Sequence, residues 1–132
     1  MENNEIFENE VRTLLVKLLD ANFVDKITHL SMNGHLHYTE HVLLQERYET
    51  YQKYFDKISE FMLEKYWDHD VTKITKSLTV EIADLELASQ AFELAVESQI
   101  KVVRESNTDS ALGSILDELE TELLSIKFKL GF

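Results

Sequence analysis

The chain has 132 residues, no proline, no cysteine and only three glycines. An all-β domain of this size builds its turns on glycine and proline, so the composition favours an all-α fold in a single domain, residues 1–132. The absence of cysteine excludes disulfides and thiolate metal sites. A formal net charge of −12 disfavours binding to phosphate backbones. It fits either a surface that attracts cations or a surface that is acidic only for solubility.

Neither end of the chain carries a recognisable targeting signal or a basic tail. The start, Met1 to Glu5, lacks the basic and apolar regions of a signal peptide. No stretch approaches the roughly 18 uncharged apolar residues of a membrane span. Only Lys127 and Lys129 lie near the C-terminus, too few cations for appreciable DNA binding at physiological salt. The sequence therefore predicts a cytoplasmic protein, with neither a membrane nor DNA as a partner.

Two long helices are predicted in the first half of the chain. The first runs from about Asn4 to Leu30, and Gly34 can end it in a left-handed conformation. The second spans about His35 to Trp67. Apolar residues recur at three- and four-residue spacing in both helices: Ile6, Phe7, Val11, Leu14, Leu15, Leu18, Leu19 and Ile27, then Val42, Leu44, Tyr48, Tyr51, Phe55, Ile58 and Met62.

Two further helices follow a less regular segment. Asp68–Asp70 predicts a turn, and residues 71–76 form either a short separate helix or the first turns of the third helix. That helix spans residues 80–105, a loop at 106–109 ends in a helix cap, and the fourth helix runs to about Leu130. Four helices with mostly short connections predict a four-helix bundle. The expected packing residues are Ile82, Leu85, Ala88, Phe92, Ala95 and Val102, then Leu112, Ile115, Leu116, Leu119, Leu123 and Ile126.

Residues suited to binding a metal share one side of the second helix. At 100° per residue, His41, Gln45, Asp56 and Glu60 fall within an arc of about 100°, so this stripe cannot face the bundle core. A rise of 1.5 Å per residue separates His41 from Asp56 by ~22 Å along the axis. Two residues that far apart cannot hold the same ion within one chain.

A two-fold contact between copies of the second helix removes this difficulty. If two such helices meet antiparallel near Tyr48 and Glu49, His41 of one copy lies opposite Asp56 of the other. The axis then produces two equivalent sites per dimer. His29, at the end of the first helix, can lean over His41 of its own chain. A homo-oligomer built on this contact is predicted.

This ordered set of residues resembles the ferroxidase signature of the Dps-type mini-ferritins, the DNA-protection-during-starvation family of the ferritin-like superfamily. The family's His-Trp-x-x-x-Gly stretch corresponds to residues 29–34, in which the histidine and glycine match and Leu30 replaces the tryptophan. The family's second histidine corresponds to His41. The carboxylates that its two-fold partner contributes correspond to Asp56 and Glu60. In helix order, the resemblance covers essentially the whole chain.

The resemblance implies a ferritin-like four-helix bundle, and in this chain the predicted connection between the second and third helices is short. It implies Fe(II) binding by His29 of one subunit and Asp56 and Glu60 of another, with a weaker second position at His41 and Gln45. Peroxide or oxygen would oxidise the iron, as in ferroxidases that counter oxidative stress. The Fe(III) would be stored as mineral in a hollow homo-oligomer, a dodecamer.

A non-catalytic assembly protein with a degenerate metal site is the alternative. Gln45 stands where the family has an aspartate ligand, and a neutral amide leaves more of the charge of a second iron uncompensated. Phe61 stands where the family has a basic residue, and the connection after the second helix is shorter than usual. Histidines mixed with carboxylates also suit Zn(II) or Mn(II).

Other groups have both a chemical and a structural interpretation. His35 and His37 can join His41 in an adventitious zinc or nickel site, although solvated histidines are more common. Asp68–Asp70 has the composition of a metal loop and equally that of a helix cap. Aromatic residues can quench oxidising equivalents near iron, but packing explains them better: Tyr48, Tyr51, Tyr54, Tyr66 and Trp67.

Overall fold

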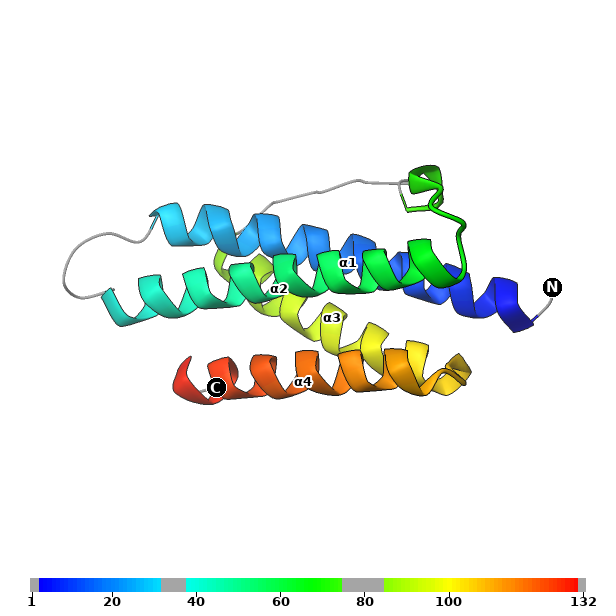
Figure 1. Ribbon diagram of the computed structural model, residues 1–132. Helices are drawn as coiled ribbons and strands as arrows, with labels where there is room; N and C mark the ends of the chain where they lie inside the picture. The colour runs from blue at the N-terminus through cyan, green and yellow to red at the C-terminus, as the bar shows by residue number, and fades with distance from the viewer. Residues whose placement is uncertain (1–2, 32–37, 75–84, 131–132) are drawn as a thin grey trace.

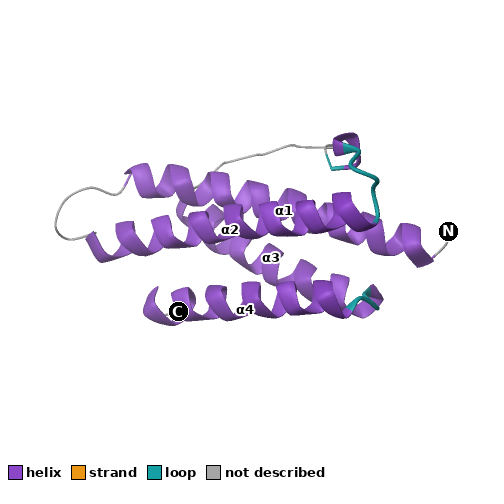
Figure 2. Cartoon of the chain, viewed as in Figure 1, coloured by secondary structure: helices purple, strands orange, loops and turns teal. Residues whose placement is uncertain are grey.

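The computed structural model describes residues 3–31, 38–74 and 85–130, and this part of the chain is helical without any strand. Figure 2 shows the helices and the short loops between them. The elements are α1 (Asn3–Ser31), α2 (Tyr38–Lys65), the 3₁₀ helix η2 (Val71–Lys73), α3 (Leu85–Ser106) and α4 (Ser110–Leu130). The all-α prediction is confirmed. The predicted helical residues 35–37 and 80–84 lie outside the described residues.

The four helices form a bundle in which α2 and α3 run in the same direction (Figure 1). The chain passes along α1, returns along α2, repeats that direction in α3 and returns in α4. α1 contacts both α2 and α3, and α2 contacts α4. α2 ends at Lys65 and α3 begins at Leu85, and these two points lie at opposite ends of the bundle. The expectation of mostly short connections therefore has one exception.

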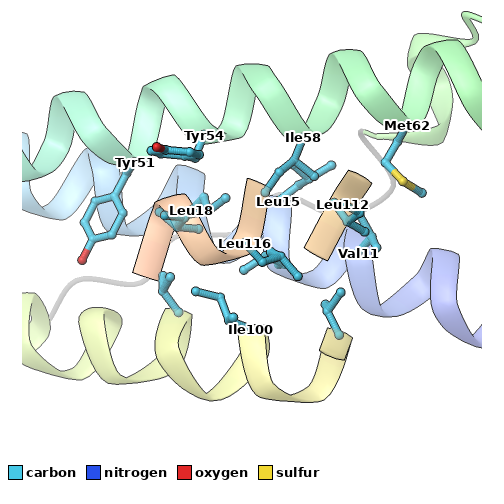
Figure 3. Close-up of a cluster of buried hydrophobic side chains, with 14 of the residues drawn as sticks. Val11, Leu15, Leu18, Tyr51, Tyr54, Ile58, Met62, Ile100, Leu112 and Leu116 are labelled. Atoms are coloured by element: carbon cyan, nitrogen blue, oxygen red, sulfur yellow. The ribbon is translucent and has the colours of Figure 1, made fainter. Parts of the chain in front are cut away.

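The core is formed by apolar side chains that all four helices direct inward (Figure 3). Leu15 and Leu18 of α1, Ile58 of α2 and Leu116 of α4 are completely buried. Burying one such side chain contributes on the order of 2 kcal/mol. For α4 the prediction is confirmed for five of its six residues, which are buried: Leu112, Leu116, Leu119, Leu123 and Ile126. The sixth, Ile115, is partly buried and packs against the core. None of the described helices has an 18-residue window apolar enough to cross a membrane.

The predicted inward face of the third helix is wrong by about one residue. Val102 was expected in the core but is 37% exposed, whereas Val103 is fully buried together with Val96 and Ile100. This stretch has apolar residues on more than one side, so periodicity alone does not fix which side faces inward. Two other expected core residues, Ile6 and Val42, are 38% and 42% exposed.

Aspartates begin the elements that follow the two described loops. Asp68 and His69 have positive φ angles of 47° and 60°, which complete the predicted turn. Asp70 then accepts a hydrogen bond from the Thr72 amide at 3.0 Å, so the structural interpretation of Asp68–Asp70 as a turn and cap is confirmed. Asp109 accepts one from the Ala111 amide at 2.9 Å, which confirms the predicted cap of α4. Lys65 also donates to Asp109, at 2.5 Å, and ties the end of α2 to the start of α4.

Candidate metal centre

Two histidines from different helices form the most specific feature of the outer surface. The rings of His29 on α1 and His41 on α2 are stacked, with centroids 3.7 Å apart and an interplanar angle of 24°. His29 Nδ1 lies 2.7 Å from the carbonyl oxygen of His41, and His41 Nδ1 lies 3.1 Å from the carbonyl oxygen of His29. The expectation that His29 leans over His41 is confirmed.

The reciprocal contacts determine which ring nitrogen can act as a ligand. A carbonyl oxygen only accepts hydrogen bonds, so Nδ1 of each histidine must carry the proton. In a neutral ring the lone pair then resides on Nε2. This is the backbone-anchored arrangement that fixes the tautomer and orientation of metal-binding histidines. His29 is 7% exposed and also contacts Tyr48 edge-on, at a centroid distance of 5.5 Å.

The remaining predicted ligands lie further along α2, on its solvent-exposed side. Gln45, Asp56 and Glu60 are exposed, and His41 is half-buried. The conclusion that this stripe does not face the core is confirmed. Among the residues that the structure describes, no three histidine or carboxylate side chains of one chain gather closely enough to hold a metal. The structure therefore brings His29 and His41 together but leaves Asp56 and Glu60 apart from them.

Gln45 makes a hydrogen bond within the same stripe. Its amide nitrogen donates to Glu49 Oε1 at 3.1 Å, one turn further along α2. The nitrogen is thereby directed toward Glu49, and the amide oxygen remains the only atom of this side chain suited to a cation. Glu49 was not predicted as a site residue. Its position one turn after Gln45 on the same side of the helix was the available signal.

A second polar centre lies inside the bundle, and the sequence analysis did not identify it. Arg47 of α2 donates from Nε and Nη2 to the two oxygens of Asp25 on α1, at 2.6 and 3.0 Å. Its Nη1 donates to Glu93 Oε2 on α3 at 2.7 Å. All three side chains are at most 4% exposed. We call Asp25, Arg47 and Glu93 the core ion cluster.

The pKa values in and around the core ion cluster are shifted by burial and by the neighbouring charges. Burial raises the pKa of Glu93, and the positive charge of Arg47 only partly offsets that effect. Burial alone would lower the pKa of Arg47, but the hydrogen bond and charge of Asp25 outweigh it and raise that pKa. Tyr51, which points from α2 toward α3 in Figure 3, has its pKa raised mainly by burial. Within the described chain, Glu93 Oε1 and the Tyr51 hydroxyl have no hydrogen-bond partner.

This cluster joins three helices through hydrogen-bonded ion pairs. Arg47 occupies an inward-facing position of α2, in phase with Leu44, Tyr51 and Tyr54. The available signal in the sequence was a charged residue at a position where the helical periodicity expects an apolar one. Hydropathy alone does not reveal it. Arg47 thus cross-links α1, α2 and α3 through both oxygens of Asp25 and one oxygen of Glu93.

The other predicted site residues are surface or packing residues. His69 is exposed in the turn after α2, and His35 and His37 lie outside the described residues. The packing interpretation is confirmed for Tyr51, Tyr54 and Trp67, each at most 3% exposed.

Comparisons of the chain with protein-family models, with curated proteins and with solved structures give no match.

Proposed function

We propose that this chain is a Dps-like protein of ferritin-like fold, which oxidises Fe(II) with peroxide or oxygen at a two-fold intersubunit site. The Fe(III) product is stored inside a hollow homo-oligomer, a dodecamer. In this proposal iron is the substrate and cargo. Each site combines His29 and His41 of one subunit with Asp56 and Glu60 of its two-fold partner.

The His29–His41 pair carries the proposal. The two rings stack at a centroid distance of 3.7 Å, and Nδ1 of each lies on the carbonyl oxygen of the other. That arrangement presents Nε2 as the ligand nitrogen on both rings. The exposed carboxylates of Asp56 and Glu60 lie on the same side of α2 as His41 and supply the anionic ligands that Fe(II) needs alongside imidazole.

The course of the chain gives independent support for the ferritin-like part of the proposal. In four-helix bundles whose three connections are all short, successive helices alternate in direction, whereas ferritin-like bundles have one long crossover. Here α2 and α3 run in the same direction, and Lys65 at the end of α2 and Leu85 at the start of α3 lie at opposite ends of the bundle. The outer side of α2 then remains available for a contact between subunits.

The chain's own residues would bind and orient the iron while the oxidant removes its electrons. Two Fe(II) ions each lose one electron, and hydrogen peroxide takes up both electrons and two protons to become two water molecules. Asp56 and Glu60 compensate the charge of the stronger position, which increases as Fe(III) forms. At the weaker position only the Gln45 oxygen is available, because its amide nitrogen donates to Glu49.

A non-catalytic assembly protein is the competing proposal, and Gln45 is the observation that favours it. A neutral amide compensates no charge, so a second iron would bind weakly and its oxidation would be slow. The two proposals differ in one measurable property, the rate of Fe(III) formation after iron has bound.

Anaerobic titration with Fe(II), followed by peroxide, separates the two proposals. We expect Fe(III) absorbance to appear fastest in Gln45→Asp, which restores a carboxylate, and more slowly in the wild type. It should stay near background in Asp56→Ala, which removes a charged ligand. Equal rates in all three proteins would reject the proposed site and favour the assembly protein.

A further inference from the structure

An exposed apolar strip on α1 lies beside the proposed metal site and has no role so far. Phe23 and Leu30 are 44% and 65% exposed, and Leu19 and Ile27 of the same helix are half-buried. Phe23 lies about 140° around the helix from the buried Leu18, so it points away from the core. An exposed apolar strip that contains an aromatic side chain is a candidate interaction surface.

The contacts between α1 and α2 show where this strip lies. Asn22 donates from Nδ2 to the carbonyl oxygen of Tyr48 at 2.6 Å, and His29 stacks on His41 at the next level of the same seam. On the circumference of α1, Phe23 lies further from the core than Asn22. On the circumference of α2, Gln45 lies further from the core than Tyr48. We call His41, Gln45, Asp56 and Glu60 the α2 stripe. Phe23 and the α2 stripe therefore lie on either side of the line along which α1 contacts α2, and they share one outer face.

The level of Phe23 coincides with the proposed two-fold axis. The register that places His41 opposite the partner's Asp56 centres the contact near Tyr48 and Glu49 of α2. Asn22 contacts Tyr48, so its neighbour Phe23 lies at that same level. In a self-complementary contact, a residue near the axis meets its own copy.

The α2 stripe alone would make a poor interface. Its members are polar or charged, and the cores of stable interfaces are apolar, with aromatic anchors near their centres. We propose that Phe23 is the apolar anchor of the two-fold contact and packs against the partner's Phe23. The occupant of this face is thus a second copy of the chain. This inference rests on the proposed α2 contact but concerns what stabilises it.

Phe23→Ala tests the anchor, and Ile6→Ala provides a matched control. Ile6 is 38% exposed at the far end of the same helix, away from the axis level. By equilibrium sedimentation we expect Phe23→Ala to weaken self-association at least about tenfold and Ile6→Ala to leave it unchanged. At protein concentrations that restore its assembly, Phe23→Ala should bind Fe(II) with wild-type stoichiometry, because no ligand is altered.

The outcomes for the anchor and for the proposed function are distinguishable. If the wild type assembles and Phe23→Ala assembles equally well, or Ile6→Ala is weakened as much, the anchor is rejected while the metal site stands. If the assembled wild type binds no Fe(II), the proposed function fails, and the sedimentation result still decides whether Phe23 holds the copies together.

Discussion

The core ion cluster and the α2 stripe both consist of charged and polar groups, yet they differ in whether these groups contact one another within one chain. In the cluster, Arg47 satisfies Asp25 and Glu93 from two other helices, at distances of 2.6–3.0 Å. In the stripe, Asp56 and Glu60 are exposed and remain apart from His29 and His41. Charges that are buried within a fold must be paired by that fold, because an unpaired buried charge is too costly.

The difference separates a structural centre from a candidate functional one. A cluster whose ion pairs form within one chain stabilises that chain. In the α2 stripe, His41 is fixed by its contacts with His29, and the carboxylates lie too far away to join the two histidines within one chain. Such an arrangement favours a site that a second chain completes. The two regions should therefore respond in opposite ways to mutation: the cluster in stability, and the stripe in binding.

Arg47→Met gives the largest expected effect on stability. It leaves Asp25 and Glu93 buried without their cation, and breaking such a pair costs about 3–5 kcal/mol. Chemical denaturation should report this loss in the free energy of unfolding. Arg104→Met is the control, because Arg104 pairs with Asp117 and Glu120 at the surface and should cost under about 1 kcal/mol. Equal losses in the two variants would contradict the role given to the cluster.

Glu93→Gln should change how stability depends on pH. Since burial raises the pKa of Glu93 in the folded state, the folded protein holds the proton of this carboxyl group more tightly than the unfolded chain does. Its stabilising contribution is complete below the ordinary pKa of 4.5 and is lost as pH rises through the raised value. Urea unfolding of both proteins across the acidic range should show that the wild type loses stability relative to Glu93→Gln as pH increases. A constant difference would mean that Glu93 titrates normally.

Asp56→Ala should give the smallest effect on stability. The side chain is exposed on α2, away from the core, so the free energy of unfolding should change by no more than about 0.5 kcal/mol. Thermal unfolding monitored by circular dichroism is sufficient to measure it. A loss comparable to that of Arg47→Met would place Asp56 in the structure of the bundle instead of on a binding surface.

Helical periodicity predicted those parts of the fold that depend on long apolar stripes. It identified α4 and its buried leucines because they recur on a single side of the helix. It misplaced the inner face of α3, where Val102 and Val103 are adjacent and only packing decides between them. The direction of α3 was not predictable either, since periodicity does not indicate how far a connection travels.

Of the two polar centres, the sequence predicted only the one whose residues have a recognisable spacing. The closeness of His29 and His41 followed from two helices joined by a short turn. Arg47 was missed because a charged residue at an inward position looks unremarkable until Asp25 and Glu93 are brought beside it by two other helices. The proposed contribution of a partner subunit to the metal site depends on contacts between two chains, which the periodicity of one sequence does not determine.

Mixing two inactive variants tests the shared site most directly. His29→Ala and Asp56→Ala each lack one half of every site, so either protein alone should bind Fe(II) only at background levels. In a dimer of one subunit of each kind, one site carries both changes and the other is intact. Half of the dimers in an equal mixture are of this kind, so roughly a quarter of the wild-type Fe(II) binding and peroxide-dependent oxidation should return. Recovery near that level would support a site divided between subunits, whereas no recovery from two folded and assembled variants would contradict it.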